Sequence, residues 1–261
     1  MKETVTTPVI RIAREQRDAV EDQVVVEYPL TVIVNGQELA TMLCSPAKLK
    51  YLAIGFLSAE GLVNKNGDIE QVRFDEDRST IEIHISGNFT LPTGCNFGRF
   101  ITATSAKGAV IYSFADGMAQ ARVKSEVTFS PSHIFNLMED FQGRSEIFKG
   151  TGGVHSAALA DHEHIMLFSE DIGRHNAVDK IFGECLMEDI PTQDRMLLTS
   201  GRVSSEILFK IARREVPVIV SRSAPTDLAI RAANDLGVTL IGFVRGGRMN
   251  VYANENRIHG A

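Results

Sequence analysis

Residues 195–244, RMLLTSGRVSSEILFKIARREVPVIVSRSAPTDLAIRAANDLGVTLIGFV, decide the fold class of this chain. Three short apolar runs within it predict strands: RMLLTS (195–200), VPVIVS (216–221) and TLIGFV (239–244). The segments between them, 203–214 and 225–236, have the apolar spacing of amphipathic helices. Strands that alternate with helices of this length are typical of a largely parallel sheet with helices on its faces. The stretch therefore predicts an α/β fold.

The residues just upstream extend the same domain. A helix is expected to start at Ser130-Pro131, and HSAALAD (155–161) and HIMLFSED (164–171) are expected to pair as strands about a polar turn. A helix over 175–188 follows, with an apolar stripe formed by Ala177, Val178, Ile181, Phe182, Cys185 and Leu186. We assign residues 128–261 to this larger domain.

The first half of the chain predicts a smaller α+β domain over residues 23–127. Two strands within 24–44 are joined at Asn35-Gly36, a strong signal for a tight hairpin. A helix is expected to start at Ser45-Pro46 and to stop near Gly61, and two alternating strands follow within 68–87. Residues 1–22 show no clear periodicity, so an N-terminal arm is expected there, either flexible or used to dock a partner.

Composition excludes several classes of protein. The formal net charge of −6 and a pI near 5.7 argue against a nucleic-acid-binding protein, which must neutralise many phosphates. No apolar run reaches the roughly 20 residues of a membrane span, and the polar start does not resemble a secretory signal. The chain has three cysteines, and they are not spaced as in a disulfide framework, which favours a reducing compartment. A cytoplasmic protein without nucleic-acid or membrane partners is expected.

Arginines recur at the loops that follow the predicted strands of the larger domain. The four loops are SEDIGRHNA (169–177), TSGRVSS (199–205), SRSAPTD (221–227) and FVRGGRMN (243–250), and they contain Arg174, Arg202, Arg222, Arg245 and Arg248. Ligands of open α/β sheets lie beyond the carboxyl ends of the strands, where helix N-termini favour anions. The loops predict a site for a ligand with several phosphates, although turn-forming residues and solvated arginines would produce a similar pattern. Neither a Walker loop nor a strand-linked GxGxxG is present.

The three cysteines differ in their surroundings. Cys185 lies on the apolar stripe of its helix and Cys44 at a strand end, so both are expected in the core. Cys95 stands in the loop LPTGCNFGRF (91–100), between Gly94 and Gly98, where its sulfur should be reachable. Access alone does not make a thiol reactive, since reactivity also needs a lowered pKa. A reactive thiol and an ordinary loop cysteine both remain open for Cys95.

The histidines leave two further alternatives open. His155 and His175 adjoin glycine-rich or helix-start loops, where they could orient a ligand or serve as satisfied structural residues. The paired HxE and PCxxC motifs of zinc deaminases do not occur in the chain. No metal site, and no zinc in particular, is expected.

Five segments in fixed order give the chain a family resemblance. They are TGGVHSAAL (151–159), EDIGRHNAVDKIFG (170–183), TSGRVSSEI (199–207), VPVIVSRSAPTDLAI (216–230) and GFVRGGRMNVY (242–252). Together with PLTVIVNG (29–36) and CSPAKLKYLAIGFLSAEGLV (44–63), they resemble the FdhD/NarQ family of formate dehydrogenase accessory proteins over about residues 24–253.

The resemblance implies a sulfur carrier of the sulfurtransferase type, whose status as an enzyme stays open. It would take persulfide sulfur from a cysteine desulfurase through Cys95 and deliver it to the molybdenum cofactor, in its bis(molybdopterin guanine dinucleotide) form, before insertion into formate dehydrogenase. It also implies a larger domain with a cytidine-deaminase-like fold. The family's cofactor-binding segment matches Phe243, Val244, Arg245, Gly246, Gly247 and Arg248 in this chain. We add Arg174, His175, Arg202 and Arg222 to that site because of the loops in which they stand.

One departure from the family and two rival functions remain. The family loop typically reads CxxC, whereas here Gly98 stands at the second cysteine position, which puts a resolving thiol in doubt. The main alternative is a molybdenum-cofactor-binding chaperone without sulfur transfer, and a nucleotide-metabolising enzyme on a deaminase-like scaffold is the other. The sequence also leaves open whether two copies form a homodimer that would present two Cys95 loops on one face.

Overall fold

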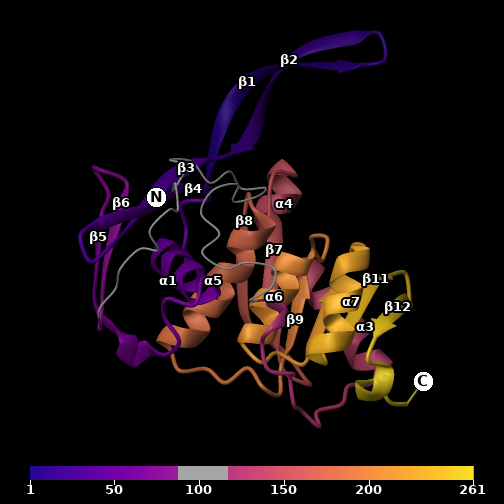
Figure 1. Cartoon of the computed structure of the whole chain (residues 1–261). Coiled ribbons are helices and arrows are strands. Elements are labelled where there is room, and N and C mark those ends of the chain that lie inside the picture. Colours follow the sequence, from indigo (N-terminus) through magenta and orange to yellow (C-terminus); the bar gives the residue numbers. More distant parts are fainter. Residues whose placement is uncertain (88–116, 261) are drawn as a thin grey trace.

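A computed structural model describes residues 1–87 and 117–260 and places their strands in three sheets (Figure 1). An N-terminal two-stranded sheet projects from the body, a four-stranded sheet forms the smaller unit, and a six-stranded sheet forms the larger one. The mixed α/β architecture is confirmed, whereas the finer likeness to cytidine deaminases stays a prediction. Within the described residues no helix is both long and apolar enough to cross a bilayer.

The N-terminal residues form a long hairpin, which their sequence did not predict. Strands β1 (Thr4–Ala13) and β2 (Gln16–Val25) pair antiparallel along their whole length, from Thr4 opposite Val25 to Ala13 opposite Gln16. The expected arm is therefore an ordered ribbon, and its second strand runs past the predicted boundary at residue 22. Pairing between β1 and β2 stabilises the hairpin, and the sequence of either strand alone does not indicate its partner.

The smaller unit has a sheet of order β4-β3-β6-β5 and one covering helix. Its strands are β3 (Tyr28–Val34), β4 (Gln37–Cys44), β5 (Ile69–Asp75) and β6 (Thr80–Ile85), with a short 3-10 turn at Asn66–Asp68 before β5. The predicted hairpin at Asn35-Gly36 is confirmed, and both residues have positive φ angles, 47° and 77°.

Helix α1 (Leu49–Ala59) begins later than its sequence predicts. The backbone N–H and carbonyl of Ser45 are occupied by hydrogen bonds to Asp171 and Lys180 of the larger unit. Lys48 then takes the left-handed conformation, with φ 53°, immediately before the first helical residue. A tertiary contact thus keeps the Ser45-Pro46 segment out of the helix.

The larger sheet has the order β12-β11-β10-β9-β7-β8 and is mixed. Its strands are β7 (His155–Ala160), β8 (Ile165–Asp171), β9 (Met196–Thr199), β10 (Val218–Ser221), β11 (Thr239–Arg245) and β12 (Arg248–Ala253). Only β9, β10 and β11 pair in parallel, so the expectation of a largely parallel sheet is wrong. β7 is antiparallel to both its neighbours, and β12 returns antiparallel beside β11 after a two-residue turn that the sequence analysis did not recognise as a hairpin.

Helices cover both faces of the larger sheet. Helices α5 (Arg174–Met187), α6 (Ser205–Arg213) and α7 (Asp227–Leu236) pack on one face, and α3 (Pro131–Arg144) packs on the other, followed by the short α4 (Glu146–Thr151). A 3-10 turn at Glu255–Arg257 lies near the end of the chain. The predicted apolar stripe of α5 is confirmed, because all six of its residues are buried.

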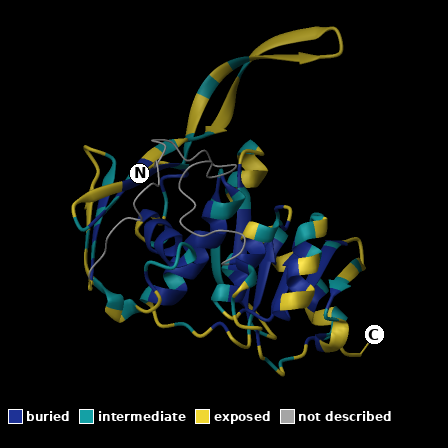
Figure 2. Cartoon of the chain, in the orientation of Figure 1, coloured by how far each residue is buried: buried dark blue, intermediate teal, exposed yellow. Residues whose placement is uncertain are grey.

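Helices α1 and α5 join the two units and lie in the most deeply buried part of the molecule (Figure 2). They cross at Gly55 of α1 and Gly183 of α5, where the two backbones approach so closely that no side chain fits. Leu186 of α5 belongs to the core of the smaller unit, while the rest of the stripe belongs to the larger one. The pair of helices therefore sets how the two units are placed relative to each other.

Candidate functional site

One edge of the larger sheet gathers the ends of several strands. Because β7 is antiparallel to β8 and to β9, strands β8, β9, β10 and β11 all run in the same direction. Their carboxyl ends share one edge, and the start of β7 at His155 lies at the same edge. The loops that bear Arg174, Arg202, Arg222 and Arg245 therefore converge on one side of the sheet, although the sheet is mixed.

A pocket of about 440 Å³ opens at this edge. Three of the residues expected at the site line it: Arg222 after β10, and Phe243 and Arg245 at the end of β11. The other walls come from residues that were not assigned to the site from the sequence. They lie in α3, in α4 and between them, around the start of β7, and just after β9 and β10: Phe141, Gln142, Ser145, Phe148, Val154, His155, Ser156, Ser200 and Ser223. The volume lies within the range of small-molecule sites.

Phe243 has an unusual backbone that places its ring in the pocket wall. Its φ is 56°, in the left-handed region, and the pairing of β11 with β12 is irregular between Gly242 and Arg245. Its N–H donates to the carbonyl of Ser223 at 3.1 Å. The Arg245 guanidinium carbon lies 5.6 Å from the ring centroid. Such conformations cost about 1–3 kcal/mol in non-glycine residues and concentrate at functional sites.

The other residues of the segment 243–248 do not line the pocket. Val244 is buried in the core, with 1% of its surface exposed, and does not line the pocket. Gly246 and Gly247 form the turn between β11 and β12, with φ angles of 57° and 70° that favour glycine. Arg248 is exposed opposite Arg245 in the hairpin and is absent from the pocket wall.

Arg174 and Arg202 form a second, separate group at the same edge. Gly201 permits their loops to approach, because a Cβ placed on it would lie 2.9 Å from the Cβ of Arg174 and 3.5 Å from Nδ1 of His155. Burial, followed by the charge of Arg202, lowers the pKa of Arg174. The Arg174 Nε atom is buried and has no hydrogen-bond partner in the described part of the chain. This pair of like charges favours an anionic ligand.

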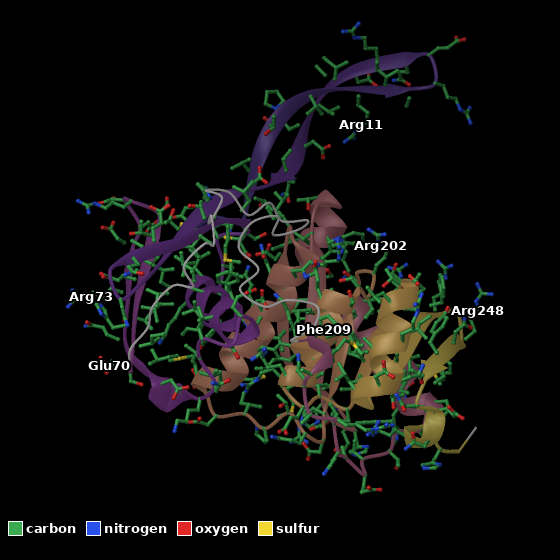
Figure 3. All side chains as sticks on the ribbon, in the orientation of Figure 1. Arg11, Glu70, Arg73, Arg202, Phe209 and Arg248 are labelled. Carbon is green, nitrogen blue, oxygen red and sulfur yellow. The ribbon has the colours of Figure 1, made fainter. Side chains whose placement is uncertain are left out.

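The five predicted arginines do not meet in one pocket. Arg202 lies over the middle of the body and Arg248 at its far side on the last hairpin (Figure 3). Arg222 and Arg245 line the pocket, whereas Arg174 and Arg202 do not. The edge is therefore divided into a pocket with two arginines and a neighbouring group with two more.

The two candidate histidines have different positions. The Nδ1 atom of His155 lies 3.3 Å from the Ser200 hydroxyl in the pocket wall, and burial, followed by Arg174, lowers its pKa. Burial, followed by Lys210, lowers the pKa of His175 to about 3, so this imidazole is neutral and its 3.6 Å contact with Glu206 is not an ion pair at neutral pH. His175 does not line the pocket.

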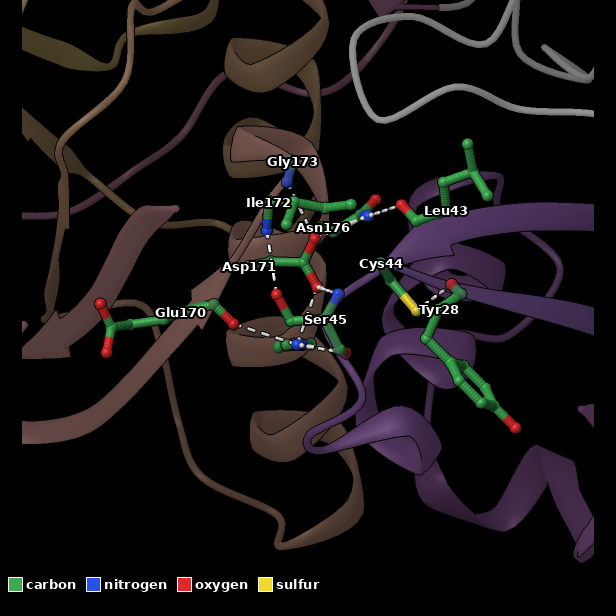
Figure 4. A network of polar contacts seen from close by, with 10 residues as sticks. Tyr28, Leu43, Cys44, Ser45, Glu170, Asp171, Ile172, Gly173 and Asn176 are labelled. Carbon is green, nitrogen blue, oxygen red and sulfur yellow. Dashed lines mark hydrogen bonds and ion pairs between the residues drawn. The ribbon is translucent and has the colours of Figure 1, made fainter. Parts of the chain in front are cut away.

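A buried ion pair supports the loop between β8 and α5 (Figure 4). The Asp171 carboxylate lies 2.8 Å from Nζ of Lys180 and accepts hydrogen bonds from the N–H groups of Ser45 and Gly173 and from the Asn176 side chain. Lys180 donates in turn to the carbonyls of Ser45 and Glu170. The network ties the smaller unit to the residue just before Arg174. The sequence shows only the local part of this network, an aspartate two residues before a glycine at the end of β8.

Both cysteines within the described residues are core residues, as predicted. Cys44 and Cys185 have no exposed surface, and burial raises the pKa of each thiol to about 12. The Cys44 thiol donates to the Tyr28 carbonyl at 3.4 Å. Cys95 and Gly98 lie outside the described residues. Across residues 1–87 and 117–260 no three histidine, cysteine or acidic side chains gather in a way that could hold a metal ion.

Comparison with known proteins adds sequence and structural relatives. The model of the FdhD/NarQ family matches residues 25–259. The chain is 40% identical over 257 residues to the sulfur carrier protein FdhD of Bacillus subtilis, covering 98% of both chains. It is 39% identical over 251 residues to the protein of the same name from Staphylococcus aureus, covering 96% of this chain and 95% of the relative.

A solved structure shares the fold. The crystal structure described as a formate dehydrogenase accessory protein from Desulfotalea psychrophila superposes with a TM-score of 0.82 at 22% identity, over 99% of this chain and 100% of that one. The family match spans both sheets of the body and the edge where the pocket opens. On this evidence the chain belongs to the FdhD/NarQ family.

Proposed function

We propose that this chain is a sulfur carrier that serves formate dehydrogenase. The proposal is supported by relatives named sulfur carrier protein that match nearly the whole chain, and by a structural relative described as a formate dehydrogenase accessory protein. Cys95 accepts sulfane sulfur from a cysteine desulfurase and passes it to the molybdenum cofactor, in its bis(molybdopterin guanine dinucleotide) form. The sulfurated cofactor then enters the dehydrogenase.

The observation that carries this assignment to Cys95 is the burial of the other two thiols. A thiol must ionise to attack a persulfide, and a pKa of about 12 leaves Cys44 and Cys185 almost entirely protonated at neutral pH. Both sulfurs are also closed to a protein partner, because neither residue has exposed surface. Cys95 is the one remaining cysteine of the chain.

The first transfer is an exchange between a thiol and a persulfide. The Cys95 thiolate attacks the terminal sulfur of the desulfurase persulfide, a new S–S bond forms, and the desulfurase leaves as a thiolate. In the second transfer, of which the cofactor is the substrate, the S–S bond of the Cys95 persulfide breaks. The terminal sulfur goes to the cofactor, which supplies the two electrons that convert it to a sulfide ligand, and the persulfide proton remains with the regenerated Cys95 thiol. A second loop thiol is not required for this sequence, so Gly98 is compatible with it.

The sheet edge has the chemistry to hold such a substrate. A guanine dinucleotide has a pyrophosphate and a planar base, and the pocket offers Arg222 and Arg245 for the phosphates and the Phe243 ring for the base. Arg174 and Arg202 supply a second positive group nearby, suited to a further phosphate. These contacts need no cysteine, so the pocket would serve equally in a cofactor chaperone that transfers no sulfur.

Sulfur loading tests the carrier role against the chaperone. After incubation with a cysteine desulfurase and cysteine, intact mass spectrometry of the wild-type protein is expected to show a gain of one sulfur atom that a reductant removes. Cys95→Ser is expected to show no gain, while Cys185→Ala is expected to load like the wild type because that thiol is buried. A wild-type protein that binds guanosine diphosphate but never gains sulfur would favour the chaperone, and loading of Cys95→Ser would remove Cys95 from the mechanism.

The pocket arginines are tested separately, by isothermal titration with guanosine diphosphate as the probe. Arg222→Gln and Arg245→Gln are each expected to weaken binding about tenfold or more, because each removes a charge-assisted hydrogen bond. Arg73→Gln, on β5 at the opposite side of the molecule, is the control and is expected to bind like the wild type (Figure 3). Unchanged affinity in both pocket variants would show that the nucleotide binds elsewhere.

A further inference from the structure

The pocket at the sheet edge has positive charge that no carboxylate balances. Arg222 and Arg245 line it, and among the described residues its wall contains no aspartate or glutamate. The backbone N–H of Arg222 donates to the carbonyl of Thr199 at 3.1 Å, which places this arginine beside the loop that begins at Ser200. Ser200 and His155 stand together in the same wall. An anion held by the arginines therefore lies close to a hydroxyl and an imidazole.

The Ser200 hydroxyl is shared between two neighbours. The backbone N–H of Ser156 donates to its oxygen at 2.9 Å, and the Nδ1 atom of His155 lies 3.3 Å from the same oxygen. A serine hydroxyl has one proton to donate and two lone pairs that accept. Because the Ser156 N–H occupies one lone pair, the protonation state of His155 decides where the hydroxyl proton of Ser200 points.

The two protonation states of His155 give the hydroxyl opposite roles. When the ring is neutral and its proton is on Nε2, Nδ1 accepts the hydroxyl proton of Ser200, for which no other acceptor exists within the described residues. When the ring is charged, Nδ1–H donates instead and, together with the Ser156 N–H, fills both lone pairs of the Ser200 oxygen. The hydroxyl proton is then released for another acceptor, such as a phosphate oxygen in the pocket.

The surroundings of His155 keep it neutral while the pocket is without an anion. Burial, followed by the charge of Arg174, lowers the pKa of His155, and Asp171 of β8 opposes this effect more weakly. His175, the next residue on α5, has a pKa of about 3 and therefore adds no charge at neutral pH. A pyrophosphate held by the pocket arginines would bring two negative charges to this wall and raise the pKa of His155.

We propose that His155 is a positioning residue for the phosphates of the bound nucleotide: it takes up a proton when the ligand binds, and Ser200 then donates its hydroxyl proton to a phosphate oxygen. The proton comes from solvent and returns to solvent when the ligand leaves. The pocket thus gains a positive charge only together with its ligand, and the free protein avoids the repulsion between a charged His155 and Arg174. The proposal rests on the nucleotide ligand of the proposed function, but it uses neither Cys95 nor sulfur transfer.

The affinity for the nucleotide then depends on pH in one direction. Since the pKa of His155 is higher in the complex than in the free protein, the affinity rises as the pH falls through the pKa of the complex and levels off below that of the free protein. A rise of roughly tenfold is expected between about pH 7.5 and about pH 5.5. The probe is diguanosine pyrophosphate, because its phosphates are diesters and do not titrate in this range, whereas the terminal phosphate of guanosine diphosphate has a second pKa of about 6, like other phosphate monoesters.

Isothermal titration in buffers of different ionisation enthalpy counts the protons that accompany binding. The wild-type protein is expected to take up about half a proton or more per ligand at about pH 6.5, the ordinary pKa of histidine. His155→Gln keeps a hydrogen-bonding side chain but cannot gain charge, so it is expected to bind the probe without proton uptake and with the same affinity at each pH. His84→Gln, on β6 of the smaller unit and outside the pocket wall, is the matched control and is expected to take up protons like the wild type.

The outcomes separate this proposal from the proposed function. A wild-type protein that binds the probe without proton uptake would overturn the role of His155 and leave the nucleotide site in place. Absence of binding at every pH would instead overturn the nucleotide site, and this proposal with it. Proton uptake that persists in His155→Gln would assign the proton to another group.

Ser200→Ala tests the hydroxyl by itself. This variant is expected to retain proton uptake, because His155 is still present, and to lose about three- to tenfold in affinity at the acid end of the range. At the alkaline end the loss is expected to be smaller, since the wild-type hydroxyl then donates to His155 and not to the ligand. Equal losses at both ends would contradict the transfer of the hydrogen bond from His155 to the phosphate.

Discussion

Gly55→Ala is expected to destabilise the protein by about 3 kcal/mol or more, because it forces apart the two helices that join the units. A Cβ placed on Gly55 would lie 1.8 Å from the carbonyl oxygen of Asp179 on α5, and one placed on Gly183 would lie 1.9 Å from the carbonyl oxygen of Tyr51 on α1. Neither obstacle is the end of a flexible side chain. The helix backbones themselves must move, and the cores on both sides of the crossing would be disturbed.

Urea unfolding of Gly55→Ala and Gly183→Ala measures this effect. Gly143→Ala is the matched control: it also places alanine in a helix, α3, but its Cβ would have no neighbour within 4 Å. The control is expected to be as stable as the wild type or more stable by about 0.5–1 kcal/mol, from the lower entropy of its unfolded chain. A Gly55→Ala protein with the wild-type unfolding midpoint would mean that α1 and α5 are not held at this distance.

Lys180→Met is expected to cost about 3–5 kcal/mol, because it leaves the Asp171 carboxylate buried without its counter-ion. The side chains of Lys180 and Asp171 are 1% and 0% exposed, and their charged atoms lie 2.8 Å apart. Arg144→Met is the matched control, since it breaks the exposed ion pair with Asp140 and should cost less than about 1 kcal/mol.

A second substitution separates the charge effect from a packing effect. If the cost of Lys180→Met arises from the unpaired carboxylate, then Asp171→Asn in the same chain should recover part of it, and the two effects should not add. Calorimetric unfolding of the two single variants and the double variant measures the coupling. Strictly additive losses would contradict the proposed role of the pair and leave only lost packing to explain them.

Much of the fold follows from local patterns. The hairpin at Asn35-Gly36 and the apolar stripe of α5 depend on residues close in the chain, so their sequences predict them correctly. The direction of β7 does not follow locally, because an apolar strand looks the same whether its neighbour runs parallel or antiparallel. The β11–β12 hairpin was missed because Gly246-Gly247 was assigned to a ligand loop, although both glycines form the turn.

In the candidate site, too, some residues were predicted from local patterns and others were not. Arg222 and Arg245 were predicted from their position after apolar strands, and the structure places both in the pocket wall. Gln142 of α3 and Phe148 of α4 were not predicted, since they do not belong to the loops that follow the strands and nothing in their own segments indicates the pocket. Val244 shares the motif of Phe243 and Arg245, yet its side chain lies in the core.

The sequence by itself determined most of the helices and strands of both units, the larger part of their cores and the arginine-bearing loops at strand ends, but not α4 or β12. Only the tertiary structure decided which of those arginines share a pocket, that Asp171 and Lys180 are buried together against Ser45, and that Gly55 meets Gly183. The physical reason is the distance along the chain between the residues that make these contacts. Periodicity reports which face of an element is buried, whereas a backbone contact or a buried ion pair depends on atoms from segments more than a hundred residues apart, such as Ser45 and Asp171.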